Sequence, residues 1–232
     1  MPASWTAVLS EDEGTTICVL SSAKDARTLP LQLVQVSAVI GRHAQTRGGL
    51  LLHGALAERE GCGPSASSGQ GVILAGPGGV GKTMASQRLL PPWRSLCDDT
   101  TLVVRDEQGA YWVHPWPTWS TFALGGPGGT WDVQRAVPLK GIFFLSQAEK
   151  TQLEPVGVGQ AVTMLVESAE QVSWPMVGDM ECEEIRAIHL QRFDNICALA
   201  QAVPCYILRL SLAGAFWQEM ERALSGNGEG PV

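Results

Sequence analysis

The segment Gly76–Thr83 constrains this chain more than any other part of its sequence. It reads G-P-G-G-V-G-K-T and satisfies the pattern G-x-x-x-x-G-K-[ST] in full. The apolar run Gly71–Ala75 precedes it, and Lys82–Leu90 follows with good helix formers until Pro91 and Pro92 stop the helix. This order predicts a buried strand, a glycine-rich turn and a helix.

A turn of this kind is suited to holding phosphate groups. Glycines let backbone N–H groups curl inward around phosphate oxygens, and the helix that follows points its positive end at them. Lys82 is expected to neutralise the β- and γ-phosphates of a nucleotide, and the Thr83 hydroxyl to coordinate Mg²⁺. A shuffled chain of this composition would show the pattern about once in a hundred trials or less. The predicted ligands of ATP and Mg²⁺ here are Gly76, Pro77, Gly78, Gly79, Val80, Gly81, Lys82 and Thr83.

Charge and hydropathy exclude several classes of protein. The 232 residues include 16 basic and 23 acidic side chains, and 45% are hydrophobic. A hydrophobic share of this size excludes global disorder, and the net charge of −7 argues against a nucleic-acid binder, which needs a basic face. There is no run of 18 apolar residues, so no membrane span is expected.

The cellular compartment is predicted from the start of the chain and from its cysteines. Met1–Gly14 has neither the basic start nor the apolar stretch of a secretory signal. The cysteines show neither a C-x-x-C pair nor zinc-site spacing, so we expect buried, reduced thiols in a cytoplasmic protein. They are Cys18, Cys62, Cys97, Cys182, Cys197 and Cys205.

Strand and helix patterns alternate along the chain, which indicates an α/β fold. Strands are expected at 15–21, 50–57, 71–75, 101–105, 110–114, 138–145 and 205–212, and helices at 82–90, 159–169, 179–202 and 216–224. Residues 31–43 fit either a helix or a strand. Residues 61–70 and 115–130 are loops by composition.

Three polar side chains are candidates for catalysis. Asp98 and Asp99 follow Thr83 by about fifteen residues, where a second strand could end beside the phosphate loop. Phosphoryl transfer needs a Mg²⁺ carboxylate and a base, and two adjacent aspartates could serve both needs. A solvated turn or a cap is the alternative. His53 lies in the apolar run Leu50–Ala57, where a core role is more common.

Together these features resemble the catalytic domain of HPr kinase/phosphorylase. That family has a His-Gly strand, a phosphate-binding loop and an Asp-Asp pair after an apolar strand. These correspond to Leu52–Gly54, Gly76–Thr83 and Leu96–Asp99. The closing run Val203–Leu208 is similar to small kinases related to the family, so the resemblance covers about residues 48–224. The tryptophan-rich loop looks like that of short kinase homologues in peptide-maturation cassettes, including the SynChlorMet type.

The resemblance implies a P-loop-containing, HPr-kinase-like fold with a mixed central sheet and flanking helices. The catalytic domain would span 49–224, with 1–48 as a lead-in to the same domain and 225–232 as a flexible tail. Related kinases assemble as oligomers, so a homo-oligomer is implied as well.

The resemblance also implies roles for single residues. Asp99 matches the residue that accepts the proton of an attacking hydroxyl, and His53 matches the family's active-site histidine. Lys82 matches the phosphate lysine, while Thr83 and Asp98 are assigned to Mg²⁺. The implied activity is an ATP-dependent kinase that transfers the γ-phosphoryl to a Ser or Thr hydroxyl of a small protein or precursor peptide.

Several departures from the family keep other functions open. Residues 61–70 are an insert, and Gly125–Arg135 lacks the glutamate that supplies a further Mg²⁺ ligand in the family. No match to the arginine-bearing loop linked to dephosphorylation is found, which speaks against HPr as substrate and against phosphorylase activity. The alternatives are a kinase for a free amino acid or polyol, and a nucleotide-binding module without chemistry. ATP and GTP are not distinguished.

Four tryptophans, Trp112, Trp116, Trp119 and Trp131, lie within twenty residues of one another. Rigid aromatic rings on a loop can recognise a peptide, and Trp116, Thr118 and Trp119 are the best candidates for that contact. The alternative is that the rings cover the edge of the core. The nearby Arg135 and Lys140 are predicted to be solvated charges, with contact to phosphate or substrate as the alternative. The histidines at 114 and 189 are predicted to be structural.

Overall fold

The computed structural model describes residues 6–9, 16–19, 28–61, 69–121, 131–173 and 181–226. Cys62, most of the loop expected at 61–70 and the second half of the loop expected at 115–130 lie outside these ranges. The first residues of the helix expected from Asp179 and the end of the expected tail also lie outside them.

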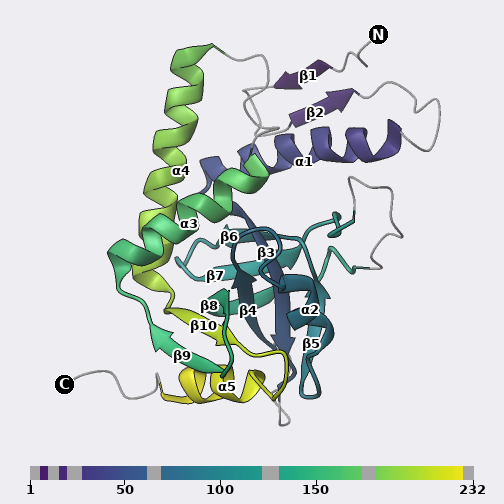
Figure 1. The fold of residues 1–232 in the computed structure, drawn as a ribbon. Coiled ribbons are helices and arrows are strands. Elements are labelled where there is room, and N and C mark those ends of the chain that lie inside the picture. The colour runs from purple at the N-terminus through teal and green to yellow at the C-terminus, as the bar shows by residue number, and fades with distance from the viewer. Residues whose placement is uncertain are drawn as a thin grey trace.

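The described chain forms a mixed sheet flanked by helices, as Figure 1 shows. The prediction of an α/β fold with a mixed central sheet is therefore confirmed. The strands are β1 (Thr6–Leu9), β2 (Thr16–Val19), β3 (Leu50–Arg59), β4 (Gln70–Ala75), β5 (Trp93–Cys97), β6 (Thr100–Arg105), β7 (Tyr111–Pro115), β8 (Val137–Gln147), β9 (Gln152–Pro155) and β10 (Cys205–Leu210). The helices are α1 (Thr28–Thr46), α2 (Lys82–Gln87), α3 (Val158–Ser173), α4 (Cys182–Ala202) and α5 (Trp217–Gly226).

Two long strands, β3 and β8, organise the sheet. The order is β4-β3-β6-β7-β8-β10-β9, with β5 also paired to β3. Strand β8 pairs with β7 near its start and with β4 further along, so the pairings of β4, β3, β6, β7 and β8 close into a ring. The pairs β4–β8 and β8–β10 are parallel, and the other pairs of this sheet are antiparallel.

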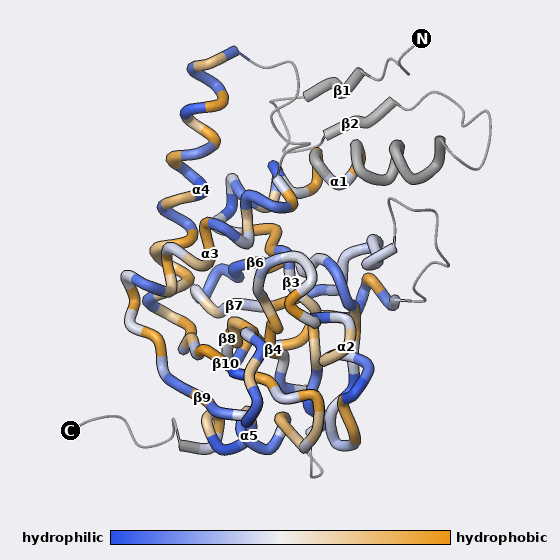
Figure 2. The backbone as a smooth tube through the Cα atoms, in the orientation of Figure 1, coloured by the Kyte–Doolittle hydropathy of each residue, from blue (hydrophilic) through white to orange (hydrophobic). Residues whose placement is uncertain are grey.

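Side chains alternate between the two faces of β3, β4 and β8, because successive residues of a strand point in opposite directions. On one face the buried Leu56, Ile73 and Phe144 belong to the same cluster as Leu165 of α3 and Leu199 of α4. On the other face, residues such as Leu74 and Phe143 pack with residues of α2 and α5. Figure 2 shows the most apolar segments gathered in the centre of the molecule. The sheet is thus covered on both faces.

The structure corrects some expected element boundaries. Residues 28–46 form helix α1, which settles the choice left open for 31–43. Helix α2 ends at Gln87 rather than at Leu90. Leu90 directly precedes Pro91, and the backbone of a residue before proline is sterically kept out of the helical φ/ψ region. Helix α5 extends to Gly226, two residues beyond the expected end at Leu224. The short edge strand β9 was not predicted.

No helix among the described residues is long and apolar enough to cross a membrane.

Candidate functional site

The glycine-rich turn adopts a backbone that its glycines permit. Strand β4 ends at Ala75 and α2 begins at Lys82. Between them Gly76, Gly79 and Gly81 have φ values of 148°, 77° and 107°. The backbone of a residue with a Cβ rarely adopts positive φ values of this kind. A Cβ at Gly79 or Gly81 would meet no atom within 4 Å, so the requirement there is the backbone conformation and not space. The turn therefore leaves an open face.

Lys82 is buried inside this turn, with 6% of the residue exposed. Its Nζ donates hydrogen bonds to the backbone oxygens of Gly76 at 2.8 Å and Pro77 at 3.0 Å. Burial lowers the pKa of Lys82, and the charge of Asp99 opposes that shift. A buried ammonium group bound to two neutral carbonyls is incompletely neutralised, which favours an anion at the turn.

Asp99 lies in the turn between β5 and β6, two strands that pair with the same strand β3. Its Oδ1 is 3.7 Å from Nδ1 of His53. Its Oδ2 accepts hydrogen bonds from the hydroxyls of Thr118 at 2.7 Å and Thr100 at 3.0 Å. The two carboxylate oxygens therefore have different surroundings.

His53 comes from β3, directly opposite Thr100 of β6 in the antiparallel register. Its backbone oxygen accepts a hydrogen bond from the Ser168 hydroxyl of α3 at 3.2 Å. Burial lowers the pKa of His53, and the positive charge of Lys82 lowers it further. The Asp99 charge and a hydrogen bond with the Asp99 backbone act in the opposite direction but do not outweigh them. The imidazole is therefore mostly neutral at pH 7, and its contact with Asp99 is not a full ion pair.

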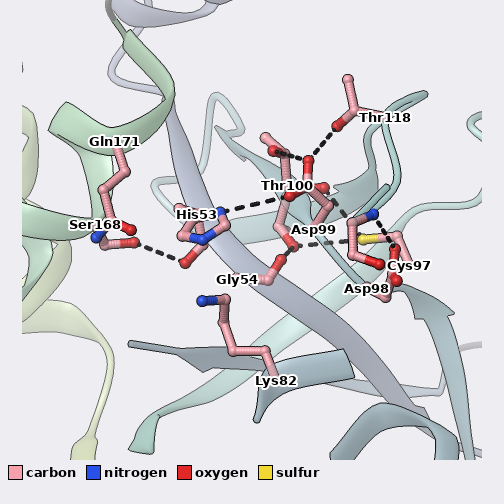
Figure 3. Close-up of polar contacts among 12 residues, drawn as sticks. His53, Gly54, Lys82, Cys97, Asp98, Asp99, Thr100, Thr118, Ser168 and Gln171 are labelled. Carbon is pink, nitrogen blue, oxygen red and sulfur yellow. Dashed lines mark hydrogen bonds and ion pairs between the residues drawn. The ribbon is translucent and has the colours of Figure 1, made fainter. Parts of the chain in front are cut away.

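The structure thus brings three of the predicted residues together: His53, Lys82 and Asp99. Figure 3 shows them converging from β3, α2 and the β5–β6 turn. The same view draws Asp98 beside Cys97, on the side of the turn away from Lys82. A cation, a neutral imidazole and a carboxylate in one place can bind an anion and accept a proton from a hydroxyl.

Asp98 has a different environment from its neighbour. It is buried, with 9% exposed, and its Oδ1 accepts a hydrogen bond from the backbone N–H of Ser120 at 3.2 Å. Thr83 is half-buried in the first turn of α2. The described residues contain no group of three or more His, Cys, Asp or Glu side chains that could hold a metal ion by themselves. The assignment of Asp98 to a metal stays a prediction.

A small pocket adjoins the phosphate loop. It lies between α3, the end of β8 and the first residues of the loop. Glu167, Ser168 and Gln171 of α3 provide its polar wall, and Figure 3 places Ser168 and Gln171 on the His53 side of the site. Sequence reasoning missed these residues, because nothing in a helical stretch indicates which face lies over the loop.

The tryptophans contribute mainly to packing and hydrogen bonds. Trp116 is 5% exposed and its Nε1 donates to the Ser37 hydroxyl of α1 at 2.9 Å, while Trp112 donates to Asp106 within the β6–β7 hairpin. Thr118 is also buried. For Trp116 and Thr118 the structure favours the alternative in which this segment covers the core. Trp119 is half-buried.

Other predictions have mixed outcomes. Arg135 is not a free solvated charge, because its Nη2 contacts the carboxylate of the fully buried Glu58. Lys140 is exposed as predicted. His114 is half-buried, and burial lowers its pKa. The four thiols whose surroundings are described are free. Cys97 and Cys205 are buried as predicted, whereas Cys182 is exposed and Cys197 is half-buried, because both lie on helix α4 away from the core of the sheet.

Comparison with known proteins gives one family. The model described as SynChlorMet cassette protein ScmC matches residues 16–225, which is most of the chain. The chain belongs to the ScmC family. The matched range includes His53, the whole glycine-rich turn and both aspartates. No curated protein matches the chain at a significant level.

Proposed function

We propose that this member of the ScmC family is an ATP-dependent kinase with an HPr-kinase-like, P-loop-containing fold. It would transfer the γ-phosphoryl of ATP to an alcohol group, with a Ser or Thr of a small protein or precursor peptide as the preferred acceptor. The description of the family links it to the SynChlorMet cassette, and the resemblance to kinases of peptide-maturation cassettes supports a peptide acceptor.

One observation carries this proposal: Asp99 and His53 lie beside the buried Lys82 of a complete phosphate-loop sequence. In the proposed reaction the acceptor oxygen forms a bond to the γ-phosphorus and the bond from that phosphorus to ADP oxygen breaks. The hydroxyl proton passes to Oδ1 of Asp99, which faces His53. Lys82 and the loop amides would neutralise the phosphates.

The residues present fit a Mg²⁺ ion that arrives with the nucleotide. Mg²⁺ is usually held by one or two protein ligands together with phosphate oxygens and water, so it needs no complete protein cage. The Thr83 hydroxyl next to the buried Lys82 suits that role. Asp98 is the weaker candidate, because it lies on the side of the turn away from Lys82 and accepts a hydrogen bond from the Ser120 N–H. When bound, the ion would supply positive charge beside the transferred phosphoryl group.

Binding of the nucleotide is tested by calorimetric titration of ATP and ADP, with and without Mg²⁺, into the wild type and Lys82→Ala. Lys140→Ala is the matched control, because Lys140 is an exposed lysine of β8. Mg²⁺-dependent binding that is lost in Lys82→Ala and kept in Lys140→Ala supports the proposal. Equal binding by all three proteins would contradict the phosphate site.

Transfer is tested with radiolabelled ATP and a library of Ser- and Thr-containing peptides. Asp99→Asn should abolish transfer and leave nucleotide affinity within a few fold, since the amide cannot accept the proton. Transfer by Asp99→Asn at the wild-type rate would refute the assigned base. Tight Mg²⁺–ATP binding without transfer to any acceptor would instead favour a nucleotide-binding module without chemistry.

A kinase for a small molecule is the second candidate. The small pocket beside Gly76 and Pro77, with its polar wall on α3, is the observation that favours it. Free amino acids and polyols tested in the same radiolabel assay distinguish the two acceptor classes.

A further inference from the structure

Thr118 is a buried hydroxyl in direct contact with the carboxylate proposed as the base. It is 8% exposed, and its Oγ1 donates to Oδ2 of Asp99 at 2.7 Å across nineteen residues of sequence. Thr100, the residue after Asp99, donates to the same oxygen at 3.0 Å. Hydrogen bonds to a charged acceptor are the stronger kind, so both contacts resist rotation of the carboxylate.

Two donors on one oxygen leave the other oxygen for chemistry. Oδ2 is occupied by the two hydroxyls, whereas Oδ1 faces His53. The charged and titratable groups around the carboxylate are His53 of β3, Lys82 of α2 and Asp98 in the same turn. We propose that Thr118 is a positioning residue that holds Asp99 so that Oδ1 is the oxygen presented to the acceptor hydroxyl. This inference rests on the proposed kinase function.

The segment that carries Thr118 is fastened on several sides. The backbone oxygen of Thr118 accepts a hydrogen bond from Nε1 of Trp131 at 2.8 Å. The N–H of Trp116 donates to the Thr100 oxygen at 3.2 Å, and the N–H of Ser120 donates to Asp98. The backbone before and after Thr118 is thus held by hydrogen bonds. The Thr118 hydroxyl therefore has a fixed position from which it can orient the Asp99 carboxylate.

The contribution of Thr118 differs from that of Thr100. Thr100 lies in β6 next to Asp99, so its backbone is already placed by the β3–β6 pairing. Thr118 follows β7 and reaches the carboxylate from a different part of the chain. Removal of the Thr118 hydroxyl would therefore free the carboxylate without disturbing the strand that carries it.

The inference is tested with Thr118→Val, which keeps the shape and removes the donor, and Thr118→Ser, which keeps the donor. Thr151→Val is the matched control, because its hydroxyl contacts Ser211 at the edge of the sheet. The assay follows inorganic phosphate released from radiolabelled ATP, with water as the acceptor. We expect Thr118→Val to lower kcat roughly tenfold or more, with KM for Mg²⁺–ATP within about twofold. Thr118→Ser should recover most of that loss, and Thr151→Val should match the wild type.

A second pair of variants covers the case in which Thr118→Val fails to fold. Trp131→Phe removes the indole donor to the Thr118 backbone, and Trp112→Phe removes an indole donor that binds Asp106 in the hairpin. We expect a lower kcat for Trp131→Phe alone. Equal kcat values for both indole variants and the wild type would overturn the positioning role.

The results separate this inference from the proposed function. An active wild type with unchanged kcat in Thr118→Val overturns the inference and leaves the kinase standing. Equal losses in Thr118→Val and Thr118→Ser also overturn it, because the hydroxyl is then not what matters. A wild type that neither binds Mg²⁺–ATP nor releases phosphate refutes the kinase. In that case the thermal stabilities of Thr118→Val, Asp99→Asn and the double variant are compared in a double-mutant cycle. Non-additive losses of stability would support the interaction of Thr118 with Asp99, and additive losses would overturn it.

Discussion

His53 and Asp99 are 46 positions apart, yet Nδ1 of the histidine lies 3.7 Å from Oδ1 of the aspartate. The cause is the register of β3 with β6, in which His53 is directly opposite Thr100. Asp99 precedes that strand by one residue, so the pairing brings its side chain to the histidine. A shift of one residue in this register would turn His53 to the other face of the sheet.

Asp99→Asn should lower the pKa of His53 further below its ordinary value of 6.5. Burial and Lys82 already lower this pKa, and the charge of Asp99 is one of the interactions that raise it. The asparagine removes that charge and leaves the two lowering causes in place. An NMR titration of the imidazole C–H resonances, assigned with His53→Gln, measures the change. An unchanged or higher pKa in Asp99→Asn would show that the two side chains do not interact in solution.

The same histidine predicts a pH dependence of folding. The pKa of His53 is lower in the folded state than in the unfolded state, so the unfolded chain binds the proton more readily. The free energy of unfolding therefore decreases as the pH drops through 6.5, the ordinary pKa of histidine. His53→Gln lacks this loss. The free energy of unfolding, measured by urea between pH 7 and pH 5, should therefore decline less in the variant than in the wild type. Parallel curves would contradict the lowered pKa.

Gly79→Ala should destabilise the folded protein by about 1–2 kcal/mol, because its φ of 77° is unfavourable for a residue with a Cβ. Gly78→Ala is the matched control, since Gly78 has no positive φ and a Cβ there meets no atom within 4 Å. Urea unfolding of both variants provides the comparison. Equal stability of the two variants would mean that the loop relaxes to accept a side chain.

Much of the sheet could be predicted from the sequence, because several of its strands are largely apolar runs. The strands at Gly71–Ala75 and 138–145 were predicted in this way. The phosphate-loop motif located the turn between β4 and α2. Strand β9 could not be found, since Gln152–Pro155 is mostly exposed and has no apolar pattern. It exists through its pairing with β10.

The site was predicted in its residue types but not in its supporting contacts. A motif and a resemblance identified Lys82, His53 and Asp99, which the fold brings together. The hydrogen bond from Thr118 to Asp99 depends on the path of the segment after β7, and no local pattern encodes it. The ion pair of Arg135 with Glu58 was missed for the same reason, since the two residues are 77 positions apart.

The Glu58 carboxylate gives the last prediction. It is fully buried and accepts hydrogen bonds from Arg94 at 2.7 Å and 2.9 Å, while Arg135 contacts its other oxygen. A buried charge without its partners costs about 3–5 kcal/mol, so the double variant Arg94→Ala/Arg135→Ala should lose stability of that order. Arg209→Ala, which breaks a half-exposed pair with Glu154, should lose under about 1 kcal/mol.

Adding Glu58→Gln to the arginine double variant identifies the reason for that loss. The neutral amide removes the unpaired charge and keeps a similar size, so the triple variant should recover part of the stability of the double variant. Urea unfolding at pH 7 measures all of these proteins. A triple variant no more stable than the double would show that the arginines act through packing of their side chains, and not by neutralising the carboxylate between β3, β5 and the segment before β8.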